Sequence, residues 1–137
     1  MLMNDQPINK EADDRMPAPP KVLVLLDNLF FAAKINQAAA QVGVQIVYAK
    51  SAEKALESVR AEAPALILVD LDAANCAPLQ LIAQLKADQE TQTIPVTGFV
   101  SHVNVSLQEE ARQAGCDRIM ARSAFDRNLL TLFSQLS

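Results

Sequence analysis

The chain has 137 residues, half of them hydrophobic, which is enough for one domain with an apolar core. Its formal net charge is −4, tryptophan is absent and no basic stripe occurs, so the composition argues against a nucleic-acid or anionic-membrane surface. No stretch approaches the roughly 20 apolar residues of a membrane span, and the first residues lack the pattern of a signal peptide. We therefore expect a cytoplasmic protein. Cys76, His102 and Cys116 are too far apart for a zinc site.

Residues 1–20 differ in composition from the rest of the chain. They hold four of the seven prolines, and their charged residues follow no period. This predicts a flexible N-terminal tail over 1–20, followed by one ordered domain over 21–137. From Lys21 onward, apolar runs of strand length alternate with helical patterns. The expected strands cover residues 21–26, 44–49, 65–70, 94–100 and 117–121.

The first two helices have recognisable start and stop residues. Asp27 can cap a helix that runs through Gln41 and ends at Gly43. Ser51 can cap a second helix, which Pro64 terminates, because the residue before a proline is disfavoured in helical conformation.

The three later helices carry different start patterns. Pro78 suits the first position of a helix that extends to about Lys86. A capping box at residues 106–109 (SLQE) predicts the next helix, which ends before Gly115. A second capping box at residues 123–126 (SAFD) predicts the last helix.

Strand and helix therefore alternate five times with short connections, which predicts an α/β fold with helices on both faces of a parallel sheet. The expected architecture is a flavodoxin-like (βα)5 three-layer sandwich with a five-stranded parallel sheet. In such sheets, ligands bind outside the carboxyl ends of the strands. Asp27 and Asp70 end the first and third of these strands, so they share one crevice if the two strands are neighbours.

Four segments occur in an order that is typical of one family: KVLVLLDN, ALILVDLD, IPVTGFV and AGCDRIMARSAF. With the helical patterns between them, residues 21–136 resemble the receiver domain of bacterial response regulators, the CheY-like superfamily. The resemblance implies that Asp70 is the equivalent of the phosphoacceptor aspartate. Asp27 and Asp72 would form the acidic pocket, in which Asp27 and Asp70 are the metal-ligand positions and Asp72 supplies a backbone carbonyl for Mg²⁺.

The remaining positions of the family site are altered in this chain. The first of the two acids after strand one falls on Leu26, which removes a carboxylate ligand. The Thr or Ser of strand four falls on Val100, although a one-residue slip would use Ser101, and the aromatic switch residue falls on Ile119. The lysine falls on Arg122. The proline that follows this lysine in the family is a serine here, so the usual cis-proline corner is missing.

These departures have physical consequences. Mg²⁺ needs oxygen ligands and charge compensation, so the loss of a carboxylate at Leu26 should weaken metal binding by orders of magnitude. A guanidinium at Arg122 can hold carboxylates bidentately, and it could offset the repulsion between Asp27 and Asp70. We therefore expect a metal-free, locked cluster with no required cofactor and at most weak Mg²⁺ binding. We therefore interpret the chain as a receiver that has lost the residues needed to switch between two states.

The leading functional reading is a stand-alone, atypical receiver-like signalling module, not an enzyme, that acts by contact with protein partners. Homodimers are an option, because the family commonly dimerises through helix four, strand five and helix five. One alternative is a working phosphorelay receiver, phosphorylated on Asp70 by a histidine kinase with help from Asp27 and Ser101. A less favoured alternative is a small enzyme or cofactor binder on the same fold, but Gly43, Gly98 and Gly115 form no phosphate-cradling loop.

Overall fold

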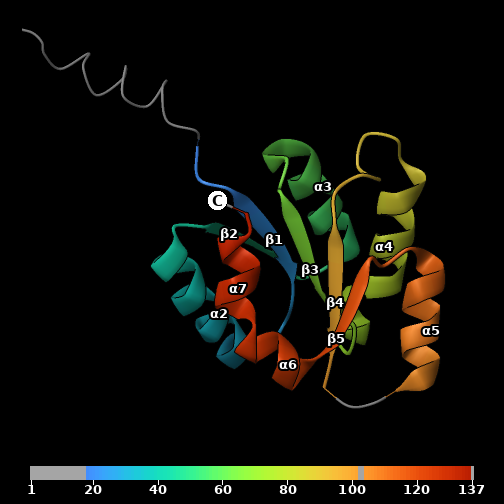
Figure 1. Cartoon of the computed structure of the whole chain (residues 1–137). Coiled ribbons are helices and arrows are strands. Elements are labelled where there is room, and N and C mark those ends of the chain that lie inside the picture. The colour runs from blue at the N-terminus through green and yellow to red at the C-terminus, as the bar shows by residue number, and fades with distance from the viewer. Residues whose placement is uncertain (1–17, 102–103, 137) are drawn as a thin grey trace, which may run out of the picture.

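The computed structural model describes residues 18–101 and 104–136 and contains one sheet of five parallel strands (Figure 1). The strand order is β2-β1-β3-β4-β5, so the predicted fold is confirmed and the first and third strands are neighbours. Each strand is a short apolar segment, and the three central ones are the most buried. The strands are β1 (Lys21–Leu25), β2 (Gln45–Ala49), β3 (Leu66–Asp70), β4 (Val96–Val100) and β5 (Arg118–Ala121).

Alternation of side chains along the strands divides the core into two apolar layers. Leu23, Leu25 and Ile67 point to one face and pack with α3, α4 and α5. Val24 and Phe99 point to the other face and pack with α2, α6 and α7. Figure 1 shows α2 and α7 together on their side of the sheet. The helices are α2 (Leu29–Val42), α3 (Ala52–Glu62), α4 (Pro78–Ala87), α5 (Val105–Ala114), α6 (Arg122–Arg127) and α7 (Leu129–Ser134), and a 3-10 turn, η1 (Ala74–Cys76), precedes α4.

Two predicted N-caps are wrong by one or two residues. The cap of α2 is Asn28, whose side chain accepts a hydrogen bond from the Phe31 N–H, and not Asp27. Asn104 caps α5 in the same way, so the helix starts before the predicted capping box at 106–109. Ser51 caps α3 as predicted. Asparagine and serine oxygens both satisfy free N–H groups at a helix start, so local sequence does not choose between adjacent candidates.

The last helix is divided in two. Helix α6 begins directly after β5 with Ala121 at its N-cap and no side-chain cap, so the predicted box at 123–126 is wrong. The chain breaks at Asn128, whose side-chain amide donates to the Ala124 carbonyl, and then continues as α7. All peptide bonds among the described residues are trans, in agreement with the missing proline at Ser123.

The predicted flexible tail over 1–20 remains a prediction, because residues 1–17 lie outside the described residues, as does His102. In the described part of the chain, no helix is long and apolar enough to cross a membrane.

Candidate functional site

The carboxyl ends of the neighbouring strands β1 and β3 lie side by side in the middle of the sheet. Asp70 is the last residue of β3 and only 2% exposed, although it carries a carboxylate. Leu26 follows β1 and is also buried, in the apolar layer beneath α2. Asp27 is exposed next to it. The position of the missing acid is thus filled by an apolar side chain that belongs to the core.

Two hydrogen bonds hold the Asp70 carboxylate. The Arg122 guanidinium donates to Oδ2 from Nη2 at 3.0 Å, and the backbone N–H of Asp72 donates to Oδ1 at 3.0 Å. Arg122 is the first residue of α6, immediately after β5, so this ion pair joins the end of the edge strand to the end of β3. An arginine is long enough to span this distance and presents its charge in a plane. No hydrogen bond or ion pair between Arg122 and Asp27 occurs among the described residues.

An aromatic cluster of Phe31, Phe99 and Phe125 lies beneath Arg122. The rings of Phe99 and Phe125 are stacked with centroids 4.5 Å apart, and Phe31 meets Phe99 edge-on at 5.2 Å. The Arg122 Cζ atom lies 4.9 Å from the Phe31 ring centroid and 5.7 Å from that of Phe99, within the range of cation–π attraction. The Arg122 Nε atom is buried without a hydrogen-bond partner. The guanidinium is therefore held by rings on one side and by a carboxylate on the other.

Burial is the dominant influence on Asp70 and raises the pKa of its carboxyl group. The Arg122 charge and the Asp72 N–H act in the opposite direction, and the neighbouring charges of Asp72 and Asp27 add to the increase, so the net direction of the pKa is upward. A buried carboxylate has this property unless a partner compensates it. Arg122 is the cation that offsets part of this effect of burial.

The other acid of the predicted pocket, Asp72, has a structural contact. Its Oδ2 atom accepts a hydrogen bond from the Ser101 N–H at 2.6 Å, which connects the loop after β3 to the end of β4. Val100 is buried, and Ile119 packs against the same apolar layer, so neither of these switch-equivalent positions offers a polar group. Ser101 is exposed.

Cys76 lies in the 3-10 turn η1, shortly after Asp70. Its side chain is 1% exposed and packs in the apolar layer under α3 and α4. Burial, followed by the nearby Asp27 and Asp70 charges, raises the pKa of the Cys76 thiol. A thiol that is both buried and protonated is a core residue.

The donor set lacks one carboxylate of a receiver-type Mg²⁺ site. Leu26 provides no oxygen, and Asp70 uses both carboxylate oxygens in hydrogen bonds to Arg122 and Asp72. The guanidinium also brings a positive charge to the carboxylate that a divalent cation would need. In residues 18–101 and 104–136, no group of three His, Cys, Asp or Glu side chains is arranged to hold a metal ion.

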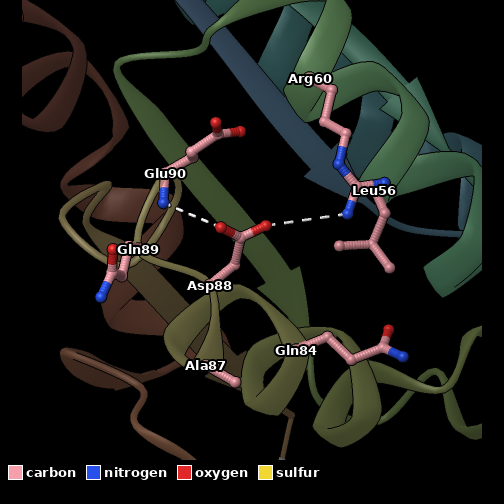
Figure 2. A pocket seen from close by; sticks show the side chains of 7 residues that line it. All are labelled: Leu56, Arg60, Gln84, Ala87, Asp88, Gln89 and Glu90. Carbon is pink, nitrogen blue, oxygen red and sulfur yellow. Dashed lines mark hydrogen bonds and ion pairs between the residues drawn. The ribbon is translucent and has the colours of Figure 1, made fainter.

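A separate hollow of about 750 Å³ lies between the C-terminal parts of α3 and α4 (Figure 2). There Asp88 faces Arg60 at 3.8 Å and accepts a hydrogen bond from the Glu90 N–H. The helices of parallel α/β units run opposite to the strands. This hollow therefore lies near the ends at which the strands begin, whereas Asp70 lies where a strand finishes. Gly43 and Gly115 end helices with positive φ, and Gly98 lies inside β4, so none of the three forms a phosphate-binding loop.

Comparison with known proteins identifies the class to which this fold and site belong. The family profile described as the response regulator receiver domain matches residues 22–133. The chain therefore belongs to the receiver domain family of response regulators, as the sequence resemblance implied.

Individual relatives are similar to the chain at low identity. The polar-differentiation response regulator DivK of Brucella anthropi is 25% identical over 104 residues, which is 76% of this chain and 85% of DivK. DivK of Brucella ovis is 29% identical over 80 residues, 58% of this chain and 65% of that protein.

Among solved structures, a response regulator from Hahella chejuensis has a TM-score of 0.76 at 20% identity and covers 84% of this chain and 92% of its own. The phosphorylated cyanobacterial phytochrome response regulator RcpA has a TM-score of 0.72 at 23% identity, covering 87% and 91%. At this level of identity, the structural likeness establishes the fold.

Proposed function

We propose that this receiver domain is atypical: it is held in a single state by Arg122 and acts through contact with protein partners, without Mg²⁺-dependent phosphorylation of Asp70. The observation that carries the proposal is the ion pair of the buried Asp70 with Arg122 at 3.0 Å. In a phosphorylating receiver, this carboxylate binds a metal ion and attacks a phosphoryl group, and an ion pair with a guanidinium competes with the metal for it. Here a permanent cation of the protein neutralises it instead.

The altered positions support the same proposal. The equivalents of the acid and of the polar switch residue are Leu26 and Val100, and both side chains belong to the core. Ile119 is partly buried against the same layer as Val100. The family's switch moves a threonine and an aromatic residue, and Val100 and Ile119 offer no counterpart to that movement. We infer that apolar packing holds these two side chains in place at the carboxyl ends of β4 and β5.

The first experiment is a titration of Mg²⁺, and then of Mg²⁺ with beryllofluoride, followed through backbone amide NMR shifts. The proposal predicts no shift at Asp27, Asp70 or Ser101 at millimolar metal. Shifts that cluster at these residues and extend into β5 would contradict it. The Asp70→Asn variant is the control for metal that binds elsewhere on the acidic surface.

One observation favours the alternative of a working phosphorelay receiver. Asp70 stands at the end of β3 with the exposed Asp27 nearby, which preserves two of the family's acidic positions. Incubation with acetyl phosphate and Mg²⁺, read by intact mass, distinguishes the two. A mass increase of one phosphoryl group that is lost in Asp70→Asn favours the alternative, whereas an unchanged mass favours the locked receiver.

The proposal also includes the cytoplasm as the location and proteins as the partners, with no role for nucleic acid. The net charge of −4 supports this, and so do the two free cysteines, both buried and unpaired with each other. The residues ahead of Lys21 are proposed to be a tail outside the receiver domain.

A further inference from the structure

The outer face of α2 is almost free of charge. Lys34 is the one charged residue among its exposed positions, and it forms an ion pair with Asp126 of α6 at 3.2 Å. Helix α3, by contrast, exposes charged residues along its length, such as Glu53 and Arg60. The exposed positions of α2 are Leu29, Phe30, Ala33, Lys34, Asn36, Gln37, Ala40 and Gln41.

Large apolar side chains protrude from the start of this face. Leu29 is 79% exposed and Phe30 is 89% exposed, the two highest values among the large exposed hydrophobic residues of the described chain. Adjacent large apolar residues at such exposure, on a face that lacks charge, are typical of a contact surface.

The spacing of this face matches that of a helix-packing seam. Leu29, Ala33, Asn36 and Ala40 follow one another at intervals of four, three and four residues, so they form one stripe along the helix. The large residue is at one end of the stripe, and the small Ala40 is at the other. A second α2 in antiparallel orientation would place Leu29 against Ala40 and Ala33 beside Asn36, which matches large with small at every layer.

The electrostatics favour the same orientation. Helix α2 has no acidic residue in its first turn and no basic residue in its last turn, so its own side chains do not compensate the helix dipole. An antiparallel copy places the negative C-terminal end of one helix beside the positive N-terminal end of the other. In this register each Lys34 lies close to the two-fold axis, and its ion pair with Asp126 offsets the repulsion between the two copies.

We propose that two copies of this chain associate through α2, packed antiparallel about a two-fold axis. In such an isologous contact, each copy uses the same residues, and the stripe is self-complementary. A helix of 14 residues is about 21 Å long, so the contact is smaller than a standard interface and the dimer is weak, in the micromolar range or above. The inference does not depend on whether Asp70 accepts a phosphoryl group.

Sedimentation equilibrium from about 10 µM to about 1 mM protein tests the proposal. We expect a concentration-dependent dimer, and at least a roughly tenfold larger Kd in Ala33→Glu, which puts two like charges close to the two-fold axis. Ala61→Glu is the matched control, because it makes the same substitution at an exposed position of α3 and should leave the Kd unchanged. Circular dichroism verifies that both variants are folded. A wild-type chain that stays monomeric, or an Ala33→Glu variant that dimerises like wild type, would overturn the proposal.

A mixture of two variants tests the contact itself. Ala33→Glu and Ala33→Lys should each associate weakly alone and should associate together, because opposite charges then face each other. The orientation is checked by mixing Leu29→Cys with Ala40→Cys under mild oxidation, since the native cysteines are buried. Faster cross-linking in the mixture than in either variant alone supports an antiparallel pair, and the reverse result refutes it.

Discussion

The guanidinium of Arg122 connects a buried carboxylate to a cluster of aromatic rings. Removal of the guanidinium leaves Asp70 buried and without its cation, which is more costly than removal of both groups. It also leaves the faces of Phe31 and Phe99 without their cation. Arg122 therefore contributes to the stability of the region around Asp70 through both of these contacts.

We predict that Arg122→Met lowers the free energy of unfolding by about 2 kcal/mol at pH 7, measured by urea denaturation. The double variant Arg122→Met with Asp70→Asn should recover part of this loss, because a neutral amide tolerates burial better. Equal losses in the single and the double variant would show that the ion pair is not the cause.

The cost of Arg122→Met should also depend on pH. The pKa of Asp70 is raised in the folded state, so its charge destabilises the fold as the pH rises above the unfolded value of about 4. Without Arg122 that pKa rises further, so the loss of stability is larger at pH 7 than at pH 4. A loss that is independent of pH would contradict this.

Short sequence motifs placed Arg122 and Asp70 at the positions of a receiver's lysine and aspartate, and the structure brings the two side chains together. The aromatic cluster beneath them could not be predicted in this way, because Phe31, Phe99 and Phe125 come from three distant segments. Phe31 is 5% exposed and belongs to the core, whereas its neighbour Phe30 is 89% exposed. No sequence pattern indicated that Phe99 and Phe125 stack, since one lies in β4 and the other in α6.

At the scale of elements, substitutions at the predicted and observed helix caps test which residues start the helices. Asn104→Ala should lower the free energy of unfolding by about 1 kcal/mol, because the Leu107 N–H loses its acceptor. Ser106→Ala, at the position that the sequence suggested as the cap, should change it by less than about 0.5 kcal/mol. The measurement is chemical denaturation of both variants. A larger effect for Ser106 would restore the capping box.

The strands were predictable to within a few residues, because continuous apolar runs that end in polar residues mark buried parallel strands. The helix starts were less so, because Asp27 and Asn28 are adjacent and both are good caps. Which of them accepts the Phe31 N–H depends on how the chain leaves β1.

Lys86 connects α4 to the start of β4 and β5. Its Nζ atom donates to the carbonyls of Gln92 and Ile94 at 3.0 Å each and to Asp117 at 2.8 Å. Asp117 also accepts from the Val96 N–H. This cluster joins α4 to the starts of β4 and β5, at the opposite end of the strands from Asp70.

We predict that Lys86→Met costs about 1–3 kcal/mol, because three acceptors lose their donor. Arg112→Met, which removes a cation from an exposed pair with Glu109, is the matched control and should cost less than about 1 kcal/mol. Thermal unfolding of both variants provides the comparison. Similar costs would mean that Lys86 is no more than a surface charge.

Asp117 gives this cluster a sensitivity to acid. Burial acts to raise the pKa of its carboxyl group, but the hydrogen bonds from Lys86 and the Val96 N–H outweigh burial and hold the pKa below its usual value. Stability from Asp117 is therefore present above about pH 4 and is lost as the pH falls through the lowered pKa. In Asp117→Asn, this part of the acid dependence should disappear, which unfolding curves between pH 2 and pH 5 would reveal.

At the scale of the whole molecule, stability should be distributed by position in the sheet. Strands β3 and β4 are buried at every residue, whereas β5 and most of β2 are at least partly exposed. We predict that amide hydrogen exchange is slowest in β3 and β4 and faster by orders of magnitude in β5. NMR-detected exchange measures this directly. Equal protection across the five strands would contradict it.

The order of strands in the sheet was open at the level of sequence, since alternation alone does not say which strands pair. The pairing of β1 with β3 brings Asp27 and Asp70 to one edge. The family resemblance predicted the overall architecture, and the departures at Leu26 and Arg122 required the structure to show what replaces the lost groups.

Two hydrogen bonds of side chains join different segments at the carboxyl ends of the strands: Asp72 with the Ser101 N–H and Arg122 with Asp70. Hydrogen bonds to charged groups contribute about 1.5–3 kcal/mol when they are buried, as at Asp70, and less between exposed groups such as Asp72 and Ser101. A receiver locked as proposed would carry no message in its own state. Its output would depend on how many copies are present and where they are placed.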